Sequence, residues 1–351
     1  AEGRVDLDEP VQSYLSEFPH SATLVRHLLE HSAGLPEFEE TDGRTNAELV
    51  AALPPESSFE PGSRFRYCNE CFDTLALLIE RTTGTSWIEF LEHHVLRRLR
   101  MDSVFLRPAR LSDWSGPRTM SYRTVGDSLV PFDIWDNEAF YGSSNLYLSA
   151  RDLGRWASAW IAGRVLPEPV RGSAKGVPQF ANGERSALNR GNWYYDEVTG
   201  PYYFNGHLRG FHHTVYWDSK SGLSVVWVTN VLEPRPNPQL LTRALVRIAE
   251  GEFNSSENLE WFGPPDSIAE WTSIHGTFDV AGLGLVTVSP SDIGASIRID
   301  DGSEFDGYPS QTLYLPAFDA EVGFSELRDG RFQKFHWISV FDSLSGRRVA
   351  R

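Results

Sequence analysis

Lysine is scarce in this 351-residue chain, in which three of the 32 basic residues are lysines: Lys175, Lys220 and Lys334. Cysteine is scarcer, and two cysteines cannot form the disulfide framework of a small secreted domain. Positive charge is in deficit, because 48 acidic residues give a net charge of −16, which excludes a general nucleic-acid binder. No apolar run approaches the ~20 residues of a membrane-spanning helix. A chain of this length and composition predicts a globular protein of about two domains.

Several common motifs are absent as well. No Gly-x-Ser-x-Gly occurs, so the sequence offers no nucleophile elbow of the α/β-hydrolase kind. Neither Gly-x-Gly-x-x-Gly nor a Walker loop is present, so dinucleotide and ATP binding have no anchor. We therefore expect no cofactor.

The first 250 residues alternate between helical and strand patterns. Polar or small residues predict helix starts at four places, with caps at Ser21, Asn69, Ser86 and Ser149. Strands are predicted at 202–207, 213–218 and 223–230, which together form an antiparallel meander. The run 223–229 is almost wholly apolar and reads as a buried central strand. A helix at 238–250 follows, so the pattern favours an α+β domain with an antiparallel sheet flanked by helices.

The last third of the chain has a different character. Residues 252–265 are polar, contain a Gly-Pro-Pro turn and read as a linker. Beyond them, short β-prone runs recur about every ten residues, which is typical of a small barrel. These runs are Leu283–Val288, Ala295–Ile299, Thr312–Leu315 and Phe335–Val340. We predict domains at 1–251 and 266–351, joined by the linker.

Two short motifs suggest metal or redox chemistry. His27, Glu30 and His31 match the His-x-x-Glu-His spacing of some zinc peptidases, but no third ligand can be assigned. We interpret the two histidines as structural and expect no metal site. Cys68 and Cys71 form a Cys-x-x-Cys pair at a predicted helix start, where a thiol can be activated. We interpret them as two small buried thiols.

Several longer segments resemble one family. Their order and spacing are those of the serine hydrolases of the class C β-lactamase and penicillin-binding-protein type. The matching segments are Leu7–Val11, Arg26–Pro36, Phe59 with Pro61 and Gly62, Phe65 with Tyr67 and Asn69, and Gly142–Leu153. The resemblance covers about residues 5–250. It implies a β-lactamase/transpeptidase-like fold, and the trailing all-β region resembles the lipocalin-like domains attached to some members.

The resemblance also implies a set of site residues. Tyr67 and Asn69 correspond to the family's second catalytic motif, Tyr-x-Asn, and His207 falls where a third motif supplies Lys or His. Tyr67 suits the role of a proton shuttle where nearby cations favour its phenolate, since a free phenol titrates near ~10. Four further residues are expected to line the substrate site: Gly142, Ser143, Arg209 and Gly210. Arg209 stands where the family usually has glycine, and a cation there can pair with a substrate carboxylate.

The family's first motif, Ser-x-x-Lys, is missing. The residues three before the lysines are Gly172, Trp217 and Arg331, so none of them is serine. In the family this motif lies about four helical turns before the segment that here begins the chain. We therefore expect the nucleophile and its lysine upstream of residue 1.

The function predicted from the resemblance is acyl transfer from an amide, peptide or ester substrate through an acyl-enzyme. D-aminopeptidases, carboxypeptidases, esterases and related acyltransferases are the activities it spans. The alternative is a catalytically inactive binding or scaffold protein that keeps the fold without the nucleophile. The partner is a small molecule or peptide, not nucleic acid, and the sequence leaves the oligomeric state open. Relatives often act in the periplasm or outside the cell.

Overall fold

The computed structural model gives the chain two compact units, each described here by itself. Unit 1 comprises Ala1–Asp218 with Val226–Leu232, and unit 2 comprises Ser219–Val225 with Glu233–Arg351. The residues that the structure describes are 3–36, 45–108, 110–125, 128–132, 142–144, 146–168, 170–195, 201–208, 210–232, 238–251, 275–280, 284–291, 294–299, 304–309, 313–315, 320–328, 331–338 and 343–349. The predicted linker at 252–265 lies outside them, so the predicted domain boundaries stay a prediction.

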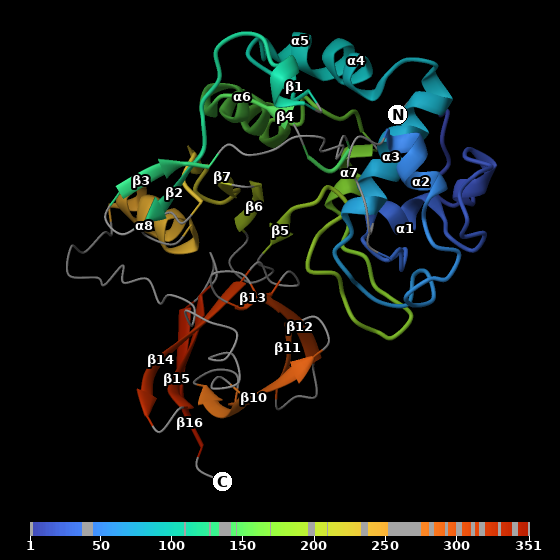
Figure 1. Cartoon of the computed structure of the whole chain (residues 1–351). Helices are drawn as coiled ribbons and strands as arrows, with labels where there is room; N and C mark the ends of the chain where they lie inside the picture. The colour runs from blue at the N-terminus through green and yellow to red at the C-terminus, as the bar shows by residue number, and fades with distance from the viewer. Residues whose placement is uncertain are drawn as a thin grey trace. The chain divides into compact units, whose positions relative to one another are not determined.

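Helices make up much of unit 1 (Figure 1). They are α1 (Val25–Leu29), α2 (Asn46–Ala51), α3 (Asn69–Thr83), α4 (Trp87–Leu91), α5 (Arg97–Leu99), α6 (Ala150–Ile161) and α7 (Val170–Lys175). A π-helical turn at Glu92–Leu96 joins α4 to α5, and 3₁₀ turns lie at Val11–Ser13 and Leu111–Asp113.

The local sequence explains where several helices begin. Ser86 caps α4 and Ser149 caps α6, as predicted, each by accepting a backbone N–H three residues on. Two predicted caps are wrong. The cap of α1 is Leu24 rather than Ser21, because the ring of His27 accepts the Leu24 N–H and replaces a polar cap. The cap of α3 is Cys68, so Asn69 is already the first helical residue.

A four-stranded sheet has the order β5 (Tyr194–Tyr195), β6 (Pro201–Leu208), β7 (Phe211–Asp218) and β8 (Ser224–Thr229). The strand order confirms the predicted meander, and β6 and β7 pair antiparallel. The prediction of a buried central strand at 223–229 is wrong. Among these four strands β8 lies at the edge, and Val228 is 44% exposed. An apolar run does not by itself distinguish a central strand from an edge strand.

Two small antiparallel sheets complete the strands of unit 1. One pairs β1 (Phe105–Leu106) with β4 (Leu146–Tyr147), and the other pairs β2 (Tyr122–Val125) with β3 (Ser128–Pro131).

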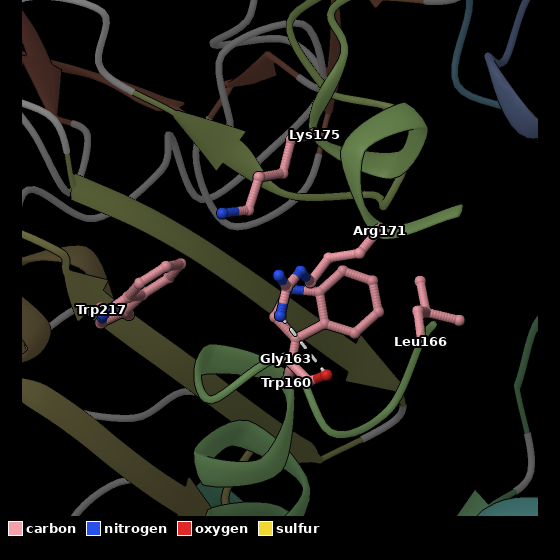
Figure 2. Close-up of a pocket in the computed structure, with 6 residues that line it drawn as sticks. All are labelled: Trp160, Gly163, Leu166, Arg171, Lys175 and Trp217. Carbon is pink, nitrogen blue, oxygen red and sulfur yellow. Dashed lines mark hydrogen bonds between the residues drawn. The ribbon is translucent and has the colours of Figure 1, made fainter. Parts of the chain in front are cut away.

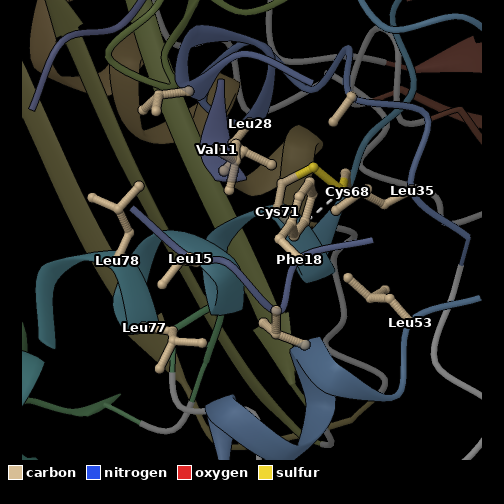
Figure 3. Close-up of a cluster of buried hydrophobic side chains, with 13 residues drawn as sticks. Val11, Leu15, Phe18, Leu28, Leu35, Leu53, Cys68, Cys71, Leu77 and Leu78 are labelled. Atoms are coloured by element: carbon tan, nitrogen blue, oxygen red, sulfur yellow. Dashed lines mark hydrogen bonds between the residues drawn. A yellow bond between two sulfur atoms is a disulfide. The ribbon is translucent and has the colours of Figure 1, made fainter. Parts of the chain in front are cut away.

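Two clusters of buried apolar side chains hold the elements of unit 1 together. The first joins the N-terminal segment, α1 and α3 and includes Val11, Leu15, Leu28, Leu77 and Leu78 (Figure 3). The second packs one face of α6 against the sheet through Leu153, Ala157, Trp193 and Val215. Burial of a leucine-sized side chain contributes about 1.5–3 kcal/mol, so the N-terminal segment is bound firmly onto α3.

The C-terminal part of unit 2 is a closed antiparallel barrel (Figure 1). Its strands are β9 (Gly276–Val280), β10 (Gly284–Ser291), β11 (Gly294–Ile299), β12 (Glu304–Pro309), β13 (Leu313–Leu315), β14 (Ala320–Arg328), β15 (Arg331–Ile338) and β16 (Ser343–Arg348). Phe278, Val280, Val286 and Val288 are buried at alternate positions, as expected for residues that face a barrel interior. The likeness of this barrel to lipocalins stays a prediction.

Helix α8 (Pro238–Glu250) precedes the barrel at the predicted position. None of the described helices has the length and apolar character needed to cross a membrane.

Candidate active site

Tyr67 and Asn69 flank the N-terminus of α3, and both are exposed. Tyr67 is 47% exposed, whereas Cys68 between them is 5% exposed and Glu70 is buried as well. The chain is extended at Cys68, so alternate side chains point to the same side. The two predicted catalytic residues are therefore presented to solvent while their neighbours anchor the segment.

Cys68 and Cys71 are joined by a disulfide (Figure 3). The prediction of two buried thiols is wrong in its chemistry, although both residues are buried. Cys68 caps α3 and Cys71 lies three residues later, a spacing that brings both side chains to the first helical turn. The sulfur of Cys68 also accepts the backbone N–H of Cys71 at 3.0 Å. The residue between Tyr67 and Asn69 is thus held both covalently and by a hydrogen bond.

His31 lies beneath Tyr67. The two rings stack with their centroids 4.6 Å apart and their planes 19° apart. Nδ1 of His31 accepts the backbone N–H of Cys68 at 3.0 Å, and Nε2 lies 3.0 Å from Oδ1 of Asn192. Since an amide oxygen only accepts, Nε2 carries the proton and donates it. Burial lowers the pKa of His31 to about 4, so the ring is neutral at pH 7.

The residues of the His-x-x-Glu-His motif make structural contacts. Nδ1 of His27 accepts the backbone N–H of Leu24, and burial lowers the pKa of His27 to about 4. Glu30 is 8% exposed and pairs with Arg190 at 2.6 Å. The three side chains therefore have separate partners. Among the described residues there is no group of three or more His, Cys, Asp or Glu side chains placed to hold a metal ion.

Gly142 and Ser143 are bound to α3 by a buried carboxylate. Oδ1 of Asp73 accepts the backbone N–H groups of Gly142 and Ser143, both at 2.9 Å. Asp73 is fully buried, and burial raises the pKa of its carboxyl to about 6 even though these hydrogen bonds oppose the shift. A Cβ atom on Gly142 would lie 2.2 Å from the carbonyl oxygen of Phe72, so only glycine fits. Asp73 lies one turn of α3 after Asn69, so these hydrogen bonds attach residues 142–143 to the helix one turn beyond Asn69.

The predicted third motif lies on the hairpin of β6 and β7. His207 is exposed near the end of β6, and its ring stacks on His212 with a centroid distance of 5.6 Å. His212 is anchored in turn, since its Nε2 lies 3.1 Å from the carbonyl oxygen of Leu232. Gly210 is buried directly before β7, whereas Arg209 lies outside the described residues. The roles of His207, Arg209 and Gly210 stay predictions.

The sequence did not identify Asp73 or Asn192, and it predicted only a structural role for His31, without a link to Tyr67. Asp73 lies four residues after Asn69 on the same helix, and this i,i+4 spacing is a signal that places the two on one face. Asn192 belongs to none of the motifs, and 161 residues separate it from His31, so no pattern points to it.

A hollow elsewhere in unit 1 is lined by two tryptophans and two cations, Trp160, Trp217, Arg171 and Lys175, together with Gly163 and Leu166 (Figure 2). It contains none of the predicted site residues. We therefore place the candidate active site at Tyr67 rather than at this hollow.

Comparison with known proteins relates these features to a family. A family model described as Beta-lactamase matches residues 1–250. The Bacillus subtilis penicillin-binding protein PbpX is 24% identical over 227 residues, which are 64% of this chain and 55% of that protein. The D-aminopeptidase of Brucella anthropi is 26% identical over 222 residues, 58% of this chain and 41% of that protein. The chain thus spans about half the length of these curated relatives.

Solved structures extend the likeness in fold. The octameric penicillin-binding protein homologue from Pyrococcus abyssi aligns with a TM-score of 0.57 at 17% identity, covering 98% of this chain and 83% of that one.

Proposed function

Because its residues 1–250 match the family model, the chain belongs to the Beta-lactamase family, and we propose that it forms part of a serine hydrolase that works through an acyl-enzyme. The observation that carries the proposal is the arrangement at the start of α3. Tyr67 and Asn69 are exposed together there, on a segment fixed by a disulfide and by His31.

In this proposal Tyr67 transfers the proton of the nucleophilic serine, and Asn69 donates a hydrogen bond to the substrate amide. The turn at Gly142–Ser143 and the segment His207–Gly210 border the substrate. A tyrosine acts as a base when a nearby cation favours its phenolate. His31 does not supply that charge at neutral pH, because its pKa is about 4. The cation is therefore assigned to the lysine of a Ser-x-x-Lys motif.

The printed chain contains no Ser-x-x-Lys. We assign the nucleophilic serine and this lysine to sequence outside the chain, as the family pattern implies. The absence of the motif also favours a second candidate function, a binding or scaffold protein that keeps the fold without the nucleophile.

For the substrate we propose small amides or peptides of D-amino acids, in preference to other amides and to esters. The support is the likeness to the D-aminopeptidase of Brucella anthropi and the C-terminal barrel, which we compare with the lipocalin-like domains of related hydrolases. We also propose a location outside the cytoplasm, in the periplasm or secreted. The Cys68–Cys71 disulfide supports this location, because disulfides persist in oxidising compartments.

The test is covalent labelling of the product of the complete coding sequence. A fluorophosphonate probe should modify one serine, and mass spectrometry should place that serine in a Ser-x-x-Lys motif. Tyr67→Phe should slow both labelling and hydrolysis of a D-alanine anilide by about 10²-fold or more, in the range of a lost general base. If the complete protein contains no labelled serine, the hydrolase proposal fails and the binding function takes its place.

A further inference from the structure

We propose that His31 is a positioning residue for Tyr67, an inference that rests on the function proposed above. His31 contacts two consecutive residues of the Tyr-x-Asn motif, Tyr67 and Cys68. Its ring supports the phenol of Tyr67, and its Nδ1 holds the backbone of Cys68, the residue between Tyr67 and Asn69.

The stacking geometry supports a positional role. The ring planes of His31 and Tyr67 differ by 19° at a centroid separation of 4.6 Å, so one face of the phenol rests on the imidazole. His31 is 2% exposed, whereas Tyr67 is 47% exposed. A fixed, buried ring therefore sets the plane in which the exposed ring lies.

Both ring nitrogens of His31 have a hydrogen-bond partner, and a residue that only packed against Tyr67 would need neither. Nδ1 accepts from Cys68, and Nε2–H donates to Asn192. A phenylalanine would fill the same space and stack on Tyr67, but it would leave the Cys68 N–H without this acceptor. Hydrogen bonding by both nitrogens fixes the tautomer and the rotation of the ring.

The anchor of His31 lies in a hydrogen-bonded turn. Asn192 has a φ of 62°, in the left-handed region, and its backbone N–H donates to the carbonyl of Asn189 at 2.9 Å. Oδ1 of Asn189 accepts the N–H groups of Gly191 and Trp193 at 2.9 and 3.1 Å. The orientation of the His31 ring is therefore set by the turn at 189–193, which is itself held by internal hydrogen bonds.

His31→Asn is the informative variant. The side-chain oxygen of asparagine can replace Nδ1 as an acceptor, but asparagine has no ring to place under Tyr67. His27→Asn is the matched control. His27 is also buried and neutral, its Nδ1 also accepts a backbone N–H, and its ring lies against Gly62 rather than Tyr67.

The first measurement is NMR of the 351-residue chain with ¹³C-labelled tyrosine. The Tyr67→Phe variant assigns the Tyr67 resonance. We expect His31→Asn to remove the ring-current shift of Tyr67 and His27→Asn to leave it in place. An unchanged Tyr67 resonance in a folded His31→Asn variant would overturn the placement of Tyr67 on His31.

The second measurement uses the complete protein and hydrolysis of a D-alanine anilide. His31→Asn should lower kcat by at least about tenfold with KM little changed, since small displacements of a reacting group cost up to about 10²-fold. His27→Asn should stay within about twofold. Should His31→Asn not fold, Asn192→Gly removes the acceptor of Nε2–H, suits the left-handed backbone and should lower kcat in the same sense.

The two measurements separate the two proposals. A wild-type kcat that survives both His31→Asn and Asn192→Gly would overturn the positioning role and leave the hydrolase proposal intact. A Tyr67 resonance that responds as expected in a protein without any hydrolase activity would instead contradict the hydrolase proposal.

Discussion

Asp73 reaches across 69 residues of sequence to accept the backbone N–H of Gly142 at 2.9 Å. Replacing Asp73 by alanine removes the acceptor of this N–H and of the Ser143 N–H. Since a hydrogen bond to a charged group contributes about 1.5–3 kcal/mol, we expect Asp73→Ala to lower the free energy of unfolding by at least about 2 kcal/mol. Urea denaturation measures the loss.

Asp73→Asn is the control for that variant, because its amide oxygen can still accept both N–H groups. It should retain most of the stability, and equal losses in the two variants would contradict a role for the acceptor oxygen.

Acid should destabilise the protein through its buried histidines. The folded state holds His27 neutral down to a pKa of about 4, whereas the unfolded chain binds a proton near the ordinary value of 6.5. The stabilising contribution is therefore complete above pH 6.5 and lost as the pH falls towards 4. At 1.36 kcal/mol per pKa unit, the loss approaches about 3 kcal/mol for this side chain. Comparing wild type with His27→Asn by urea denaturation from pH 4 to 7 isolates it, and a constant difference would refute it.

The backbone conformation of Gly62 and its contact with His27 explain why a glycine occupies this position before Tyr67. Its φ is +78°, and a Cβ atom there would lie 2.9 Å from Nε2 of His27. We expect Gly62→Ala to cost about 2 kcal/mol or more, from backbone strain and from this contact. Gly84→Ala is the matched control, because Gly84 has a φ of +74° with open space around it. Thermal unfolding should show the larger loss for Gly62→Ala, and equal losses would exclude the contact with His27.

The charge at position 192 should control the protonation of His31. Asn192→Asp places a carboxylate at Nε2–H, and an adjacent opposite charge typically raises a histidine pKa by about 1–3 units. Asn192→Gly removes the hydrogen bond that now favours the protonated ring, so it should lower the same pKa below about 4. NMR titration of the His31 ring measures both shifts. Movement of the pKa in the same direction in both variants would contradict the assigned hydrogen bond.

Reduction of the Cys68–Cys71 disulfide should have a modest effect on stability. The bridge closes a loop of four residues, for which the chain-entropy model gives about 2 kcal/mol at most. Urea denaturation with and without dithiothreitol measures this, and Cys68→Ala with Cys71→Ala should make the protein indifferent to the reductant. A loss well above this bound would show that the disulfide stabilises the fold by more than loop closure.

The sequence predicted the features that depend on local patterns. Caps at Ser86 and Ser149, the strand order of the meander and helix α8 all follow from short-range signals. The family of the chain also follows from motifs, as the match over residues 1–250 confirms.

The predictions that failed depend on tertiary contacts. Leu24 begins α1 because a histidine three residues later replaces a polar cap. The position of β8 at an edge depends on the other strands. The pairing of His31 with Asn192 spans 161 residues and leaves no pattern in the sequence.

The C-terminal barrel is closed by pairing its first strand, β9, with its last, β16, so that Val280 lies opposite Gly346. Closure therefore has to wait during synthesis until the final strand has left the ribosome. Until then the nascent barrel has two unpaired strand edges, which are the surfaces through which chains aggregate. Pairing of β16 with β9 is therefore the step that removes these two edges and ends the period in which the barrel is prone to aggregate.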